Sequence, residues 1–278
     1  MRTTEFEQWL TNPHRETLVM GVLNVTPDSF SDGGRFASTE AAISHAREMV
    51  RDGAAIIDIG GESTRPGAAR VEIDEQIHRL VPVILGLVDL PALISVDTTR
   101  ATVARAAVEA CANLVNDISG GLDDEQMLPT IARLGVPVIL MHMRGQPATM
   151  QSMASYADVL ADVRRHLMER LTAARAAGVD FDRVLLDPGI GFAKTADHNL
   201  ELMRRLGELT SLGRPLVLGT SRKKFIGTIT GEDQPSNRLF GTAATVGWCV
   251  ANGASIVRVH DVSPMVKVVK MVRAIAGR

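Results

Sequence analysis

Short apolar runs alternate with helix-like segments along almost the whole chain. Residues 184–186, Val-Leu-Leu, form one such run, which suits a strand buried on both faces, as in a parallel sheet. Asp187, Pro188 and Gly189 follow it and indicate a loop. The same layout recurs and predicts eight strands, at residues 18–26, 55–60, 93–96, 114–119, 137–143, 184–187, 215–221 and 255–261.

Segments with apolar residues at helical spacing separate these strands. Ile73, Ile77 and Ile84, for instance, share one face of a predicted helix. Helices are expected at residues 38–51, 72–88, 100–111, 125–134, 156–177, 198–212, 224–230, 239–251 and 263–276. Residues 1–17 lack such a pattern and are expected to form a polar surface lead-in or a short strand.

The alternation of strands and helices predicts an α/β fold. Parallel strands need crossover connections, and each predicted helix is long enough to provide one. Repeated eight times, this unit favours a closed (β/α)8 TIM barrel, which would occupy residues 18–278 as a single domain. An open doubly wound sheet is disfavoured, because no G-x-G-x-x-G motif follows the first strand.

Composition narrows the functional class. The 278 residues are 45% apolar and 22% charged, which is typical of a globular protein. The net charge of −2 predicts no nucleic-acid partner, and no apolar run approaches a membrane span of about 20 residues. Cys111 and Cys249 have no ligand spacing and are expected to pack as small apolar residues in a reducing compartment. Together these features predict a cytoplasmic protein without a signal peptide.

A polar residue stands near the carboxyl end of every predicted strand. Each one alone could be a structural hydrogen bond or a helix cap. Together they predict an active site at the mouth of the barrel. The set comprises Asn24, Asp58, Asp97, Asn116, His142, Asp187, Ser221 and His260.

Three of these residues suit a flat, nitrogen-rich ring. A carboxylate accepts two parallel N–H bonds from an amidine edge, and asparagine both donates and accepts, so Asp97, Asn116 and Asp187 predict a pocket for such a heterocycle. Met141 and Phe192 could form its apolar walls, although a purely core role for Met141 is an equal alternative.

Basic residues near the last two strands indicate an anion site. Ser221 and the following residues 222–224, Arg-Lys-Lys, lie where a strand meets a helix, and free N–H groups at a helix start bind anions. Arg258 and His260 are two residues apart and should face the same side. We expect at least one residue of 222–224 to contact the ligand; the alternative is a solvated basic turn. The long loops at 27–36 and 61–71 are expected to act as lids, and could bring Asp28, Asp32, Ser63, Thr64 and Arg65 to the substrate.

Long motifs carry a family resemblance from about residue 18 to 262. VMGVLNVTPDSFSDGG, IIDIGGESTRPGA, SVDTTR, VNDIS, LMHMRGQPATMQ, LLDPGIGFAKT, GTSRKKFIG and RVHDV occur in this order. They resemble the dihydropteroate synthase family of folate biosynthesis. The resemblance implies the condensation of a dihydropterin methyl diphosphate with 4-aminobenzoate, giving dihydropteroate and diphosphate.

The resemblance also implies roles for individual residues. It assigns the pterin to Asp97, Asn116, Asp187 and Lys223, with Met141, Phe192 and Gly219 around the ring. It assigns a Mg2+ ion that carries the diphosphate to Asn24, and the diphosphate itself to Arg258, His260 and Arg65. It assigns 4-aminobenzoate, and the sulfonamides that mimic it, to Thr64, Pro66, Ser221 and Phe30. It gives Asp58 a role in organising the second loop.

A homodimer through late helices is a further implication of the resemblance. Met265, Val268, Val269 and Val272 could form the contact, although a stripe that faces the core is the preferred interpretation.

The residue types fit an SN1-like transfer. Mg2+, Arg258 and His260 would stabilise the leaving diphosphate, while Asp97 and Asp187 would favour the cationic pterin. Three alternatives remain open at this point. They are a corrinoid-linked pterin methyltransferase, a barrel lyase that uses Lys223 as a Schiff base, and a pterin-binding paralogue without activity.

Overall fold

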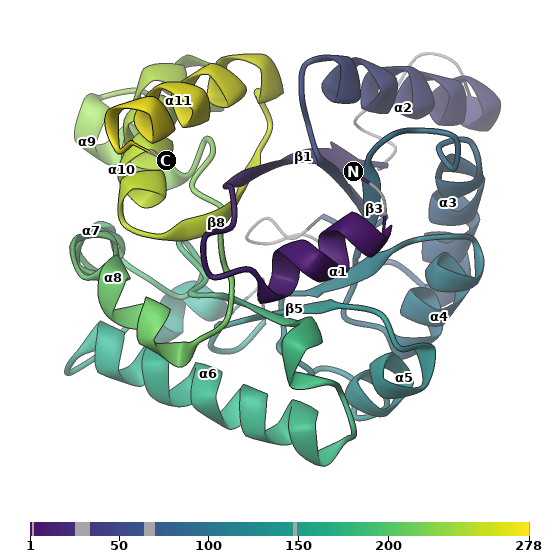
Figure 1. Cartoon of the computed structure of the whole chain (residues 1–278), viewed down its shortest axis with the longest axis horizontal. Coiled ribbons are helices and arrows are strands. Elements are labelled where there is room, and N and C mark those ends of the chain that lie inside the picture. The colour runs from purple at the N-terminus through teal and green to yellow at the C-terminus, as the bar shows by residue number, and fades with distance from the viewer. Residues whose placement is uncertain (2, 26–33, 64–69, 147–148, 278) are drawn as a thin grey trace.

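Eight parallel strands close into a barrel in chain order (Figure 1). The computed structural model describes residues 1, 3–25, 34–63, 70–146 and 149–277. The strands are β1 (Leu18–Asn24), β2 (Ile56–Gly60), β3 (Leu93–Asp97), β4 (Leu114–Asp117), β5 (Val138–Met141), β6 (Val184–Asp187), β7 (Leu216–Leu218) and β8 (Ala254–Val259). The barrel closes because β8 pairs with β1, Leu18 lying opposite Ile256. The predicted TIM barrel is confirmed.

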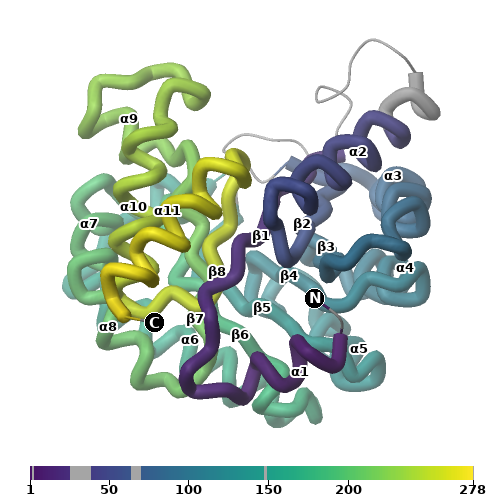
Figure 2. The backbone as a smooth tube through the Cα atoms, turned by 45° about the horizontal axis from the view of Figure 1, so that its top comes forward, coloured from purple at the N-terminus to yellow at the C-terminus, as the bar shows by residue number. Residues whose placement is uncertain are grey.

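Helices surround the strands on the outside (Figures 1 and 2). They are α1 (Thr3–Thr11), α2 (Gly34–Arg51), α3 (Ile73–Leu85), α4 (Ala101–Glu109), α5 (Met127–Leu134), α6 (Val159–Ala176), α7 (Ala196–Arg204), α8 (Leu206–Leu209), α9 (Lys224–Thr230), α10 (Leu239–Ala251) and α11 (Val262–Ile275). Short 3-10 turns lie at η2 (Met150–Met153), η3 (Phe181–Arg183), η4 (Thr210–Leu212) and η5 (Pro235–Arg238). The helix predicted at 198–212 is therefore divided between α7, α8 and η4.

Alternation along each strand separates two cores. In β2, Ile57 and Ile59 face the helices and join the large cluster between the barrel and its outer layer. Ile56 faces the interior and belongs to a second cluster at the amino-terminal end of the barrel. Asp58 is fully buried on the same inner face, one layer above Ile56. β2 thus contributes Ile56 to the apolar cluster at the amino-terminal end and Asp58 to the polar layer above it.

The expectation for residues 1–17 is wrong. Residues Thr3–Thr11 form α1, which lies across the amino-terminal opening of the barrel (Figure 1). Phe6, Trp9 and Leu10 are buried against the interior ends of the strands. The polar residues between them gave the segment a mixed pattern, and a barrel opening that needs an apolar cover decides its structure.

Two smaller expectations are settled by burial. Cys249 packs in the core as expected, but Cys111 is exposed in the turn after α4, so it does not pack as an apolar residue. Met265 and Val269 of α11 are buried in the core, which confirms the preferred interpretation of that stripe.

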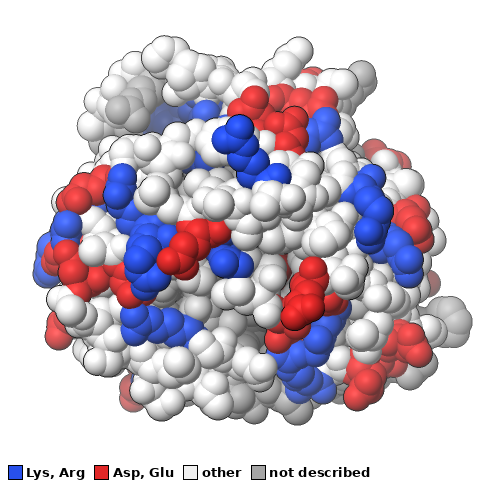
Figure 3. Space-filling model, turned by 90° about the horizontal axis from the view of Figure 1, so that it is seen from below, with Lys and Arg blue, Asp and Glu red and all other residues white. Residues whose placement is uncertain are grey.

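One face of the surface carries mixed charge. Figure 3 shows the face on the α6 side of the barrel, where Lys and Arg side chains alternate with Asp and Glu rather than forming a field of one sign. Among the described helices, none has the length and apolar character needed to cross a membrane.

Candidate active site

Three side chains from different strands meet inside the barrel through direct ionic contacts. Arg258 of β8 donates from Nε to Asp58 Oδ2 (2.6 Å) and from Nη2 to Asp97 Oδ2 (2.8 Å). Neither β2 nor β3 is a sheet neighbour of β8, so these ion pairs cross the interior of the barrel. The predicted proximity of Asp97 and Arg258 is therefore observed.

Asp58 lies inside the barrel, as its membership of the strand-end set predicts. It accepts hydrogen bonds from Arg258 and from Asn116 Nδ2 (3.0 Å). Its predicted role in organising the second loop concerns residues 64–69, which lie outside the described ranges, and stays a prediction. The structure makes Asp58 the buried anchor of both Arg258 and Asn116.

Asn24 lies at the rim of the same group. A Cβ atom on Gly60 would lie 3.6 Å from both Asn24 Oδ1 and Asp97 Cβ, so the glycine leaves these two side chains close together. Asp97 and Asn116 are opposite each other in the register of β3 and β4, which places them on the same face.

Asp187 completes the opposite wall. Its Oδ1 accepts the backbone N–H of Gly189 (2.7 Å) in the loop that follows β6. Phe192 belongs to the same loop, and Lys223 Nζ lies 4.0 Å from the centre of its ring. Gly191 packs directly on Lys223, because a Cβ there would lie 2.9 Å from Lys223 Cδ and the residue has a φ of +84°.

The apolar wall is a separate small cluster. Met141 and Phe192, both predicted to flank the ring, belong to it, and Gly219 lies beside Arg258. The cluster contains Ile118, Met141, Met143, Met150, Phe192 and Ala193. A planar ring between Asp97, Asn116 and Asp187 would therefore have an apolar face beside it.

Burial shifts the protonation of the site. It raises the pKa of the Asp97 carboxyl to about 7 in spite of Arg258, and that of Asp187 to about 6 in spite of the Gly189 N–H and Lys223. Burial and the neighbouring Arg258 lower the pKa of Lys223 to about 8. Perturbed carboxyls and amines that converge at a strand-end site are typical of an active site.

Ser221 and His260 form the second part of the mouth. Ser221 Oγ accepts the backbone N–H of His260 (3.2 Å) and lies 3.1 Å from its Nδ1. Burial, followed by Arg258 and Arg222, lowers the pKa of His260 to about 3, so the imidazole is neutral at pH 7. It can therefore offer a hydrogen bond rather than a charge.

The basic residues after β7 diverge. Lys223 faces the Phe192 ring, while Arg222 donates from Nε to Asp261 Oδ2 (2.9 Å). Lys224 is exposed at the start of α9. Of the three candidates for ligand contact, Lys223 alone lies in the group of Asp187 and Phe192 described above.

His142 does not belong to the mouth. It follows the inward-facing Met141, so its ring points outward and lies against His166 of α6, with ring centres 4.8 Å apart. The prediction that every polar strand end faces the site is wrong at this position, because His142 is in the outward-facing register of Val138 and Leu140.

Several predicted residues lie outside the described ranges. These are Asp28, Phe30, Asp32, Thr64, Arg65 and Pro66. Ser63 is described, and with Asp97, Thr98 and Ser119 it lines a cavity of about 370 Å³ that adjoins the site.

Two buried charged residues beside the site were not predicted from the sequence. Asp117 is buried beside Asn116, and its carboxylate accepts hydrogen bonds from Ser119 N, Ser119 Oγ and Gly121 N, which shapes the loop after β4. Lys194 is buried behind the loop after β6. The only sequence signal for either was a charged residue within a motif rich in glycine.

The described side chains fit a metal ion that the substrate carries. No cluster of three or more His, Cys, Asp or Glu side chains that could hold a metal is found in the described ranges. The amide oxygen of Asn24 is a hard oxygen donor at the rim, and Mg2+ is commonly bound by one or two protein oxygens together with substrate phosphates. Asn24 therefore fits the role assigned to it by the resemblance.

A family model described as "Pterin binding enzyme" matches residues 20–260. This range contains nearly the whole barrel and every described residue of the site above. The chain belongs to this family of pterin-binding enzymes.

Relatives and solved structures narrow the class. The dihydropteroate synthase of Synechocystis sp. is 50% identical over 264 residues, which are 94% of this chain and 91% of the relative. The structure of Xanthomonas albilineans dihydropteroate synthase with 4-aminobenzoic acid matches with a TM-score of 0.89 and 43% identity, over 95% of this chain and 94% of that chain. The same enzyme in complex with 7,8-dihydropteroate matches with a TM-score of 0.86 and 40% identity, over 95% of each chain. Within its family, the chain groups with the dihydropteroate synthases, which are transferases of folate biosynthesis.

Proposed function

We propose that this protein condenses 6-hydroxymethyl-7,8-dihydropterin diphosphate with 4-aminobenzoate, giving 7,8-dihydropteroate and diphosphate. The observation that carries the proposal is the convergence of Asp97, Asn116, Asp187, Lys223 and Arg258 at one mouth of the barrel. Acceptors, donors and an apolar face are then available together, as a planar heterocycle requires.

The pterin binds with its nitrogen-rich edge toward the buried acids. Asp187 Oδ1 is occupied by the Gly189 N–H, which leaves the other oxygen of the carboxylate for the ring. Asn116 Nδ2 is held by Asp58, so its amide is oriented before the substrate arrives. Preorganised acceptors of this kind fix one orientation of the ring.

Bond cleavage develops charge at both ends of the reacting bond. The diphosphate leaves toward Arg258 and His260. Asn24 would hold Mg2+, which would neutralise part of the diphosphate charge. Asp97 and Asp187 stabilise the positive charge on the pterin methylene, which 4-aminobenzoate then attacks. No protein nucleophile takes part, so a covalent pterin adduct on Lys223 would contradict the SN1-like path.

The 4-aminobenzoate site lies next to Ser221. The start of α9 follows Ser221 closely, and the hydroxyl is already oriented by the backbone N–H of His260. Phe30, Thr64 and Pro66 would contribute from the two early loops, with Arg65 near the diphosphate. Sulfonamides, as mimics of 4-aminobenzoate, should compete there.

We also infer a homodimer that works in the cytoplasm. Phe240 is 85% exposed and Trp248 48% on α10, while Met271 is 61% exposed on the neighbouring α11. An apolar patch of this kind marks an interaction surface. The variant Phe240→Asp should shift the mass measured by light scattering from dimer to monomer; a wild-type monomer would contradict the inference.

Turnover tests the function directly. Purified protein, Mg2+, the pterin diphosphate and 4-aminobenzoate should give dihydropteroate, detected by mass spectrometry. A reaction without 4-aminobenzoate is the control. Absence of product from protein that circular dichroism shows to be folded would favour a pterin-binding paralogue instead.

A further inference from the structure

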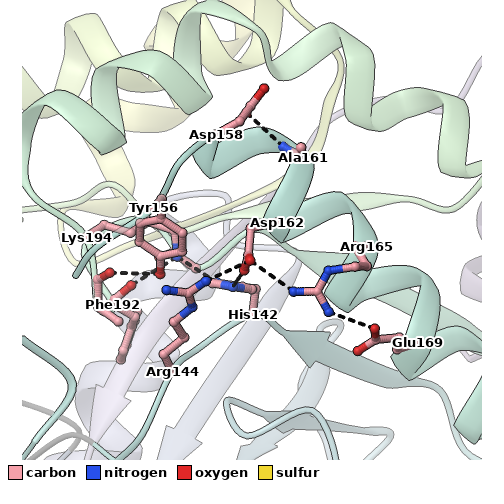
Figure 4. A network of polar contacts seen from close by, with 12 residues as sticks. His142, Arg144, Tyr156, Asp158, Ala161, Asp162, Arg165, Glu169, Phe192 and Lys194 are labelled. Carbon is pink, nitrogen blue, oxygen red and sulfur yellow. Dashed lines mark hydrogen bonds and ion pairs between the residues drawn. The ribbon is translucent and has the colours of Figure 1, made fainter. Parts of the chain in front are cut away.

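A buried network lies behind the pocket, between β5, α6 and the loop after β6 (Figure 4). At its centre is Lys194, which is 4% exposed. Its Nζ donates to the carbonyls of Gly189 (2.9 Å) and Phe192 (3.0 Å) and lies 2.9 Å from His142 Nδ1. Burial lowers the pKa of Lys194 to about 7, so the protonated form predominates below pH 7. In that form the amine has three donors, one for each of these partners.

Both carbonyls belong to residues that shape the pocket. The N–H of Gly189 holds Asp187 Oδ1, and the Phe192 ring lies against Lys223. A Cβ on Gly189 would lie 2.0 Å from the carbonyl oxygen of His142, so the loop packs directly on the end of β5. Lys194 therefore contacts the backbone of Phe192 directly and is connected to Asp187 through Gly189.

The other side of the network anchors Lys194 to the outer helix. With Lys194 as the donor, the neutral ring of His142 accepts at Nδ1 and carries its proton on Nε2, which lies 3.6 Å from Asp162 Oδ1, outside hydrogen-bond distance. Asp162 is held by Arg144 Nη2 (2.7 Å) and Arg165 Nη2 (2.9 Å). Burial and Lys194 lower the pKa of His142 well below its usual range, which is consistent with a neutral acceptor.

A second tether runs parallel to the first. Tyr156 Oη donates to the carbonyl of Ala193 (2.9 Å), and the Arg144 guanidinium lies 4.0 Å from the centre of the Tyr156 ring. Figure 4 shows Arg144, Tyr156 and His142 gathered around Lys194. The loop after β6 is thus held by Lys194 and Tyr156 through the carbonyls of Gly189, Phe192 and Ala193.

We propose that Lys194 is a positioning residue for the pterin, which holds the Gly189 and Phe192 carbonyls so that the Asp187 carboxylate and the Phe192 ring are set before substrate binds. The inference rests on the proposed function. Lys194 is not a catalytic residue, because its amine is enclosed and all its donors are used. Its effect reaches the substrate through the loop.

The decisive variant is Lys194→Met, which retains an unbranched side chain and removes the three donors. We expect the dissociation constant for the pterin diphosphate, measured by calorimetry, to rise about tenfold or more, since small displacements of positioned groups are costly. The KM for 4-aminobenzoate should change less than twofold. Lys267→Met, at an exposed position of α11, is the matched control and should change neither value.

A pair of variants at His142 separates positioning from general stability. The Asn Oδ1 of His142→Asn can replace Nδ1 as the acceptor, whereas His142→Leu has none. We expect His142→Asn to bind the pterin within about threefold of wild type and His142→Leu to lose about tenfold. If Lys194→Met does not fold, this pair still tests whether the contact between Lys194 and His142 sets the pterin affinity.

Two results would overturn the proposal. One is a parallel rise of both constants in Lys194→Met; the other is a lower melting temperature with unchanged pterin affinity. Because binding is measured without turnover, wild-type protein that binds the pterin but forms no product would refute the proposed function and leave this test intact.

Discussion

The two ends of the barrel are built from the same strands and have opposite characters. At the amino-terminal end, Phe6, Trp9 and Leu10 of α1 close an apolar layer that includes Ile56 and Leu93. At the carboxyl end, Asp97 and Asp187 are buried and have raised pKa values, and the partly buried Lys223 and Arg258 lie beside them. Figure 2 shows α1 and α9 at these opposite ends. One end therefore supplies stability, and the other holds costly polar groups for binding and chemistry.

The largest expected effect is at the carboxyl end. Asp187→Ala should lower kcat/KM for the pterin diphosphate at least about 1000-fold, roughly 4 kcal/mol, because it removes the acceptor of the ring. The melting temperature should not fall, since the carboxylate that is removed is desolvated in the folded protein. Asp197→Ala, at an exposed position of α7, is the control. Unchanged pterin affinity in Asp187→Ala would mean that the pocket is misplaced.

The opposite end should show the reverse result. Phe6→Ala should lower the free energy of unfolding by about 3 kcal/mol, because a fully buried ring is lost under the barrel. Denaturation with urea measures this, and kcat at 25 °C should stay within twofold for the folded protein. Val88→Ala, at an exposed position, should leave both values unchanged. A large loss of kcat in Phe6→Ala would show that the two ends are coupled.

Asp58 lies between the ends and should affect both. In Asp58→Asn the oxygen that Arg258 and Asn116 use can remain, while one charge that stabilises Arg258 is lost. We expect about 2 kcal/mol less stability and a decrease of kcat/KM of about tenfold. Asp52→Asn, in the exposed turn after α2, is the comparison. A loss of stability with unchanged kcat/KM would show that Asp58 has a structural role only.

The smallest expected effect is a pH dependence of the carboxyl end. As pH falls from 8 to 5.5, Asp97 (pKa about 7) and Asp187 (pKa about 6) take up protons and lose acceptor strength. Pterin affinity, measured by calorimetry, should therefore fall about tenfold.

Stability should move the other way over the same range. The folded pKa values of these carboxyls lie above the unfolded value of about 3.9, so their stabilising contribution is lost as pH rises through 6 and 7. The free energy of unfolding of wild type, minus that of Asp187→Asn, should therefore be larger at pH 5.5 than at pH 8. A difference that grows with rising pH would contradict the assigned shifts.

The sequence predicted the fold and much of the site. Uninterrupted apolar runs located the strands, and polar residues at their ends placed Asp97, Asn116 and Asp187 at the mouth. It failed at His142, whose side chain points outward because it alternates with that of the inward-facing Met141. It failed at α1, whose apolar residues are recognisable only when the open end of the barrel is known.

The sequence by itself determined the eight strand–helix units, because period and turn residues are local properties. It also determined which chemical groups were available to the site. Tertiary structure alone decided that Arg258 joins Asp58 to Asp97 across the barrel and that Lys194, in the loop after β6, meets His142 at the end of β5. These contacts join residues that are far apart in the sequence, and they form only when the strands pair into the barrel and bring their backbones within reach.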